Sequence, residues 1–117
     1  MSAVPVISFG GVLPEPQRYS PPPERIVAGN PAQSAWNFFS SADGHFHSGI
    51  WESQPGKWRV VFNESEFCHL LEGVIVVTGD DGSVVTFRAG DAFVSPAGFT
   101  GYWEVLTTAR KYYAIYE

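Results

Sequence analysis

The chain has 117 residues, of which 44% are hydrophobic and 16% charged, so it can form one compact domain with its own core. Its formal net charge is −5 and it has no run of Lys or Arg, which argues against nucleic acid as a partner. A single cysteine excludes an intramolecular disulfide, and the lack of a secretion signal or a membrane-length apolar stretch predicts a cytoplasmic protein without membrane association.

Residues 1–33 are expected to form an extended N-terminal arm. Five of the nine prolines fall between positions 14 and 23, and proline has no N–H group to donate to a β-sheet. In this interpretation the arm has little regular pairing, apart from a candidate edge strand at residues 4–9. The sequence leaves open whether the arm wraps around its own domain or crosses to a second subunit.

The rest of the chain, residues 34–117, predicts a single antiparallel β-barrel. Turn signals separate short runs rich in aromatic and β-branched residues: Asp-Gly at 43–44, Pro-Gly at 55–56, Gly-Asp-Asp-Gly at 79–82 and Pro-Ala-Gly at 96–98. Because a chain this short must hide its sheet edges, the predicted fold class is an all-β closed barrel or jelly roll. The expected strands are 36–39, 45–53, 58–62, 66–78, 83–87, 92–95, 102–106 and 111–116.

Two motifs resemble those of the cupin superfamily, the RmlC-like jelly rolls. The first runs from Glu66 to Gly73, and the second comprises Gly90, Pro96 and Gly98. Shorter segments are similar, more narrowly, to the small single-domain cupins of the ureidoglycine aminohydrolase group, which also resemble the ethanolamine-utilisation cupins. These segments are Gly-Ile-Trp at 49–51, Pro-Gly-Lys-Trp at 55–58, Leu-Glu-Gly at 71–73, Gly-Tyr-Trp at 101–103 and Arg-Lys-Tyr-Tyr at 110–113.

The resemblance covers about residues 30–117 and implies a cupin barrel, but it indicates no particular reaction because cupins host many unrelated functions. It also implies a metal site of three histidines and one glutamate inside the barrel, suited to Mn, Fe, Ni, Cu or Zn. Glu66 matches the glutamate. The histidine positions fall on Val60, Phe62 and Gly101, or on Arg59 and Val61 for the first two with a longer spacing, and none of these is a histidine.

A different pair of histidines offers a second candidate metal site. His45 and His47 form a His-x-His pattern, so both project to the same side of a strand, together with Trp51. If this strand borders the one that carries Glu66, the three side chains would hold a divalent ion such as Mn, Fe, Ni or Zn. The competing interpretation is that both histidines are solvated at the rim of the barrel, just after a hairpin turn.

Glu66 is the strongest candidate for a catalytic residue, with Lys111 as its partner. An inward-facing carboxylate in an apolar barrel is costly unless it is paired, and Lys111 lies between strand-forming aromatic residues. The pair would serve in acid–base chemistry, with Lys111 orienting or neutralising an anion. The competing interpretations are a purely structural pair and a lysine that extends its amine to water.

Several further side chains are candidate walls of a substrate-binding pocket. Aromatic residues with apolar faces and polar edges suit a small-molecule site, although large aromatics are equally at home in a core. Cys68 shares the side of Glu66 and should face inward, whereas His69 should point to the opposite face. The candidate binding residues are Trp51, Trp58, Cys68, Trp103 and Tyr113.

Three functions remain open on the sequence alone. The missing histidines favour a metal-free cupin that binds a small molecule. The retained Glu66, with His45 and His47, favours a metal-dependent enzyme acting on a small nitrogen-containing metabolite, similar to ureidoglycine aminohydrolase. The third is an accessory subunit with a vestigial pocket. A homodimer is expected because the proline-rich arm is long and the short chain has exposed sheet edges. The resemblance implies the same, since the cupins that the sequence resembles form dimers.

Overall fold

The computed structural model describes residues 4–117, and this part of the chain is all-β, as predicted. One short 3₁₀ helix, η1 (Pro23–Arg25), interrupts the strands. The strands are β1 (Gln17–Tyr19), β2 (Ile26–Gly29), β3 (Gln33–Ser40), β4 (Phe46–Ser53), β5 (Gly56–Val61), β6 (Ser65–Gly79), β7 (Val84–Arg88), β8 (Ala92–Ser95) and β9 (Thr100–Tyr116). No helix in the described residues is long and apolar enough to cross a membrane.

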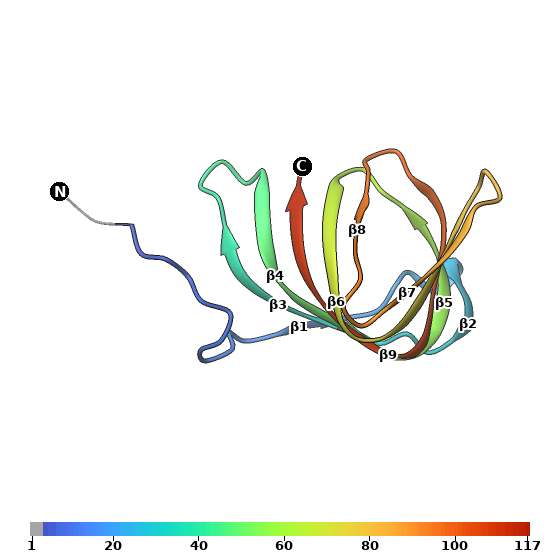
Figure 1. The fold of residues 1–117 in the computed structure, drawn as a ribbon, viewed down its shortest axis with the longest axis horizontal. Helices are drawn as coiled ribbons and strands as arrows, with labels where there is room; N and C mark the ends of the chain where they lie inside the picture. The colour runs from blue at the N-terminus through green and yellow to red at the C-terminus, as the bar shows by residue number, and fades with distance from the viewer. Residues whose placement is uncertain (1–3) are drawn as a thin grey trace.

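All strand pairs are antiparallel and belong to one sheet that curls into a barrel (Figure 1). The main path runs β1-β3-β4-β9-β5-β2, and β6 adds β7 and β8 while also pairing with β9. The long strand β9 therefore contacts three partners: β4, β5 and β6. This arrangement confirms the predicted all-β fold, an antiparallel barrel of the jelly-roll type.

The N-terminal segment differs in part from the expected arm, of which residues 1–3 lie outside the described range. Residues 4–16 have no regular secondary structure, so the candidate edge strand at 4–9 is absent, and Figure 1 shows the start of this segment, in blue, running away from the barrel. In contrast, β1 pairs with β3 and β2 pairs with β5, so the later half of the segment joins the sheet. The prolines do not prevent this pairing because they flank the two short strands rather than interrupt them.

The barrel interior is filled by alternate residues of the long strands. On β9 the inward positions include Trp103, Val105 and Tyr113, and on β6 they include Cys68 and Leu70, all of them buried. Successive side chains of a strand point to opposite faces, so this period of two follows directly from strand geometry. Two charged side chains, Glu66 on β6 and Lys111 on β9, occupy inward positions in the same series and are 7% and 2% exposed.

Candidate functional site

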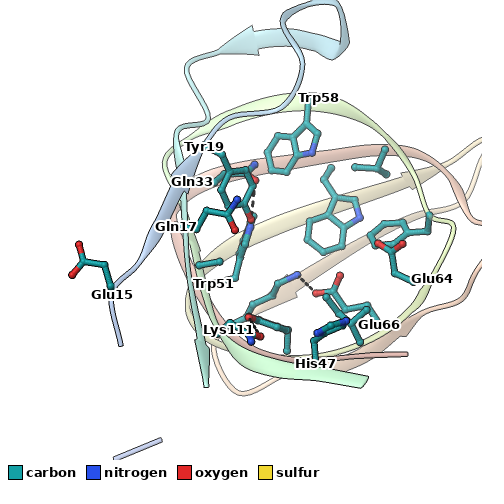
Figure 2. Close-up of a pocket in the computed structure, with 17 residues that line it drawn as sticks. Glu15, Gln17, Tyr19, Gln33, His47, Trp51, Trp58, Glu64, Glu66 and Lys111 are labelled. Carbon is teal, nitrogen blue, oxygen red and sulfur yellow. Dashed lines mark hydrogen bonds and ion pairs between the residues drawn. The ribbon is translucent and has the colours of Figure 1, made fainter. Parts of the chain in front are cut away.

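A pocket of about 640 Å³ opens into the barrel interior (Figure 2). Its size lies within the range of small-molecule sites, about 300–1,000 Å³. Its walls come from the segment that includes β1 and from strands β3, β4, β5, β6 and β9. The lining residues that the sequence singled out are His47, Trp51, Trp58, Glu66, Trp103, Lys111 and Tyr113.

Glu66 and Lys111 form an ion pair inside the barrel, as their inward positions predicted. The Lys111 Nζ atom donates to Glu66 Oε2 over 2.7 Å, and the two residues are 2% and 7% exposed. Burial is the largest single effect on Lys111 and lowers its pKa, but Glu66 and Cys68 together outweigh burial and raise this pKa above its ordinary value. Lys111 is therefore an ammonium group at neutral pH rather than a free amine nucleophile.

Two tryptophans enclose the ammonium group of Lys111. Its Nζ atom lies 4.5 Å from the centroid of the Trp51 ring and 4.2 Å from that of Trp103. Cations bind to indole faces at such distances, and the interaction strengthens where water is excluded. Trp58 packs against both indoles, with centroid separations of 6.4 Å. The aromatic residues thus stabilise the protein's own cation as well as the pocket wall.

Cys68 is fully buried and does not line the pocket, so its predicted role in substrate binding has no counterpart in the geometry. Its Sγ atom lies 3.3 Å from both Lys111 Nζ and Glu66 Oε2, beside the ion pair. Burial raises the pKa of the Cys68 thiol to about 12. A thiol that stays protonated at neutral pH is a poor nucleophile, so Cys68 acts as packing around the pair.

The positions that correspond to the cupin histidines face the pocket but carry no metal ligands. Val60 and Phe62 line the pocket, and Gly101 lies directly opposite Val60 in the sheet. A Cβ atom at Gly101 would lie 2.0 Å from the backbone oxygen of Thr78, so no side chain fits there without a shift of the backbone. With Glu66 also bound to Lys111, these residues do not fit the metal that the cupin resemblance implies.

His45 and His47 are separated by the start of β4. His47 lines the pocket, whereas His45 precedes the strand, is exposed and lies 6.4 Å from the Tyr116 ring. The structure therefore brings His47, but not His45, to the same pocket as Glu66. Within residues 4–117, no group of three or more His, Cys, Asp or Glu side chains is arranged to hold a metal ion.

His47 belongs to a chain of hydrogen bonds that the sequence analysis missed. The Tyr113 hydroxyl donates to Asn37 Oδ1 over 2.9 Å, and Asn37 Nδ2 donates to Ser40 Oγ over 2.9 Å. Ser40 Oγ then lies 2.8 Å from His47 Nδ1, while His47 Nε2 lies 2.9 Å from the Gly44 carbonyl oxygen. Both nitrogens of His47 thus have protein partners, which orients the ring as part of the wall.

Sequence reasoning also missed the polar residues contributed by the N-terminal half. Gln17, Tyr19 and Gln33 lie together on one side of the pocket (Figure 2). Gln33 Oε1 accepts a hydrogen bond from Trp51 Nε1 at 3.3 Å, but Gln33 Nε2 is buried without a hydrogen-bond partner in the described structure. The only signal for these residues was the alternation of Gln17 with Tyr19, which is too short to identify a strand beside prolines.

A family model described as an EutQ-like cupin domain matches residues 40–113. No protein with a curated description matches the chain. Among solved structures, EutQ from Clostridium difficile is similar with a TM-score of 0.64 and 19% identity, over 74% of this chain and 68% of that one. A DUF861 family protein from Thermotoga maritima shares 34% identity with a TM-score of 0.54, over 55% of this chain and 73% of that one.

A DUF861 family protein of unknown function from Pseudomonas syringae pv. tomato matches more of the chain. Its TM-score is 0.81 and its identity is 24%, over 93% of this chain. The match covers 46% of the Pseudomonas protein, so the present chain spans less than half the length of that relative. At this identity the likeness concerns the fold, and it transfers no substrate.

Proposed function

Because the chain belongs to the EutQ-like cupin domain family, we propose that it is a cupin that binds a small molecule in its barrel without a metal ion. The observation that carries the proposal is the pocket of about 640 Å³, whose wall combines three tryptophans with a buried ion pair. Such a mixture of apolar faces and a few fixed polar groups is typical of small-molecule sites.

We propose a site without a metal because of the side chains that occupy the metal-binding positions. Metal-binding cupin positions are occupied by Val60, Phe62 and Gly101, which offer no side-chain lone pairs, and the retained Glu66 already has a cationic partner in Lys111. A carboxylate that neutralises a buried ammonium group loses much of its attraction for a second cation. Lys111 thus supplies the positive charge that a metal supplies in other cupins.

The alternative is a metal-dependent enzyme acting on a small nitrogen-containing metabolite, similar to ureidoglycine aminohydrolase. One observation favours it: His47 and Glu66 line the same pocket. It requires Mn, Fe, Ni or Zn to draw Glu66 away from Lys111, and it requires His45 to turn inward from its exposed position. In that case Glu66 and Lys111 would be the candidate catalytic residues.

Elemental analysis of untagged protein, purified without a chelator, separates the two functions. We expect no stoichiometric metal in the wild type or in Glu66→Gln, and we expect a small ligand to raise the melting temperature. A ligand at 100 times its dissociation constant adds about 2.7 kcal/mol to the free energy of unfolding. Glu72→Gln, an exposed change on the same strand, controls for loss of charge.

Near-stoichiometric Mn, Fe, Ni or Zn that is lost in Glu66→Gln but kept in Glu72→Gln would overturn the metal-free proposal. If a screen of small acids, amines, ureides and sugars also found no stabilising ligand, the proposed binding function would fail.

A further inference from the structure

The pocket carries an excess of negative charge. Its lining includes three carboxylates, Glu15, Glu64 and Glu66, against one ammonium group, Lys111, which gives a formal charge of −2 with His47 counted as neutral. Glu66 and Lys111 neutralise each other through their ion pair. Glu15 and Glu64 form no ion pair with a lysine, arginine or histidine among residues 4–117. The uncompensated charge of the pocket therefore comes from these two residues.

The two free carboxylates stand at different depths. Glu15 is exposed and belongs to the irregular segment before β1, whereas Glu64 is half-buried immediately before β6. Figure 2 shows Glu64 on the same side of the pocket as Glu66, with Glu15 on the opposite side, farther out. Glu64 is thus placed to contact a bound molecule, and Glu15 adds a longer-range negative field at the mouth.

Buried polar atoms without partners point independently to a ligand. Gln33 is 7% exposed and lines the pocket, and its Nε2 atom is buried with no hydrogen-bond partner in the described structure. Trp103 is 2% exposed and also lines the pocket, and its buried Nε1 atom likewise has no hydrogen-bond partner in the described structure. Buried N–H groups are almost always paired in folded proteins, so each needs an acceptor that the described residues do not provide.

We propose that the ligand of this pocket is a small organic cation that also carries a hydrogen-bond acceptor, with its positive group near Glu64 and its oxygen near Gln33. This inference rests on the proposed binding function and names the chemical class of the ligand. The carboxylates attract the positive group, and an oxygen acceptor pairs with the orphaned amide.

The aromatic wall is consistent with a cation and less so with an anion. Trp58 and Phe62 line the pocket, and neither ring has a lysine or arginine of the described chain over its face, so both remain free to contact an organic cation. An anion would have to compete with Glu66 for Lys111, whose ammonium group is buried and already bonded. Such an anion would also face the repulsion of Glu64 and Glu15.

Matched probes of equal shape and different charge test the inference. Choline is compared with its neutral isostere 3,3-dimethylbutan-1-ol, and glycinamide with propionamide; 3,3-dimethylbutanoate and malonamate serve as anions. Binding is measured by calorimetry and by the fluorescence of the pocket tryptophans. We expect each cation to bind at least about tenfold more tightly than its neutral partner, a difference of about 1.4 kcal/mol.

Glu64→Gln tests the residue that carries the selectivity, and Glu72→Gln is the matched control with the same loss of charge outside the pocket. Glu64→Gln should remove most of the preference for cations at an unchanged melting temperature, whereas Glu72→Gln should keep the preference.

Each other outcome contradicts a defined part of the argument. If the neutral isosteres bind as tightly as the cations, or if Glu64→Gln leaves the preference intact, the inference about charge fails while the binding function stands. Tightest binding of the anions would overturn the inference and would make Lys111 the recognition group. If no probe of any charge binds, the inference fails together with the proposed function for ligands of this size.

Discussion

Lys111 and Glu66 are two charged side chains in the interior of a small barrel, and each depends on the other. Their charged atoms are 2.7 Å apart, and Cys68 with two tryptophan rings fills the space around the ammonium group. A buried pair of this kind contributes little net stability compared with apolar residues of the same shape, yet the loss of one partner leaves an uncompensated charge. The two residues should therefore show strong energetic coupling.

The stability losses of the two single substitutions, added together, should exceed the loss of the double substitution. Glu66→Gln and Lys111→Met should each lower the free energy of unfolding by about 3–5 kcal/mol, because each leaves one buried charge alone. The double variant should lose less than the two single losses combined. Urea denaturation measures all three, with Glu72→Gln expected within about 0.5 kcal/mol of wild type. Additive losses would mean that the two charges are solvated independently.

The same pair predicts how stability depends on pH. Burial opposes the charge of Lys111, but its contacts with Glu66 and Cys68 together outweigh burial, so the pKa of Lys111 is raised above its ordinary value of 10.5 in the folded protein. The unfolded chain therefore releases this proton first as the pH rises. The contribution of the pair is fully present below pH 10.5 and is lost as the pH rises through the higher folded value. In thermal melts at increasingly alkaline pH, the wild type should lose this contribution to its free energy of unfolding. The Glu66→Gln, Lys111→Met double variant should not.

At the scale of elements, the sequence predicted the long strand β6 and its inward side because the alternation there is long. It divided β9 into two strands, 102–106 and 111–116, whereas the structure has one continuous strand, Thr100–Tyr116. Residues such as Glu66, Trp103 and Lys111 all fall on the predicted face. The strands β1 and β2 were missed because three or four residues beside prolines carry too little pattern. Their pairing with β3 and β5 depends on partners distant in the sequence, and this pairing brings the unanticipated wall residue Tyr19 to the pocket.

The His-x-His pattern shows why local spacing alone does not define a site. His47 lies within β4 and reaches the pocket, whereas His45 lies in the preceding turn, where alternation no longer applies. The polar residues Asn37 and Gln33 gave no signal at all, because a single amide in a strand reads as an ordinary surface residue. Only the curvature of the sheet brings them to the same pocket as Glu66.

The close approach of β6 and β9 makes Gly101 a sensitive position. Its added Cβ atom would meet the backbone oxygen of Thr78 at 2.0 Å, and backbone atoms do not move aside as a flexible side chain does. Gly101→Ala should lower the free energy of unfolding by about 1–3 kcal/mol or more. Gly11→Ala is the control, because nothing lies within 4 Å of the Cβ position there. Thermal melts of equal midpoint for the two variants would contradict this account.

At the scale of the whole molecule, the segment before β1 makes the shape asymmetric. The molecule measures 52 Å along its longest axis against 28 and 27 Å along the others. Phe9 holds the segment to the barrel by stacking on Phe38 at 4.4 Å. Val6 and Val12, on either side of that contact, are 97% and 96% exposed. Val4 is also 90% exposed, so several exposed apolar side chains gather on this one segment, which is the kind of surface that another subunit can cover.

We propose that this segment packs against a second copy of the chain to form a homodimer. Size-exclusion chromatography with light scattering should give about twice the chain mass of 12.8 kDa. Combined Val6→Ser and Val12→Ser substitutions should shift the mass toward that of one chain, while the control variant Gly11→Ala should not. A wild-type mass near 12.8 kDa would refute the proposal.

The dependence of the barrel on β9 has a consequence for how the protein is made. Because β9 (Thr100–Tyr116) pairs with β4, β5 and β6, the first 99 residues lack their common partner until this segment is synthesised. Until then, a nascent chain on the ribosome exposes unpaired strand edges and the apolar side chains of the future interior, which invites aggregation. The barrel should therefore close only after β9 has left the exit tunnel. Until that late step, chaperone binding would protect the exposed nascent chain from aggregation.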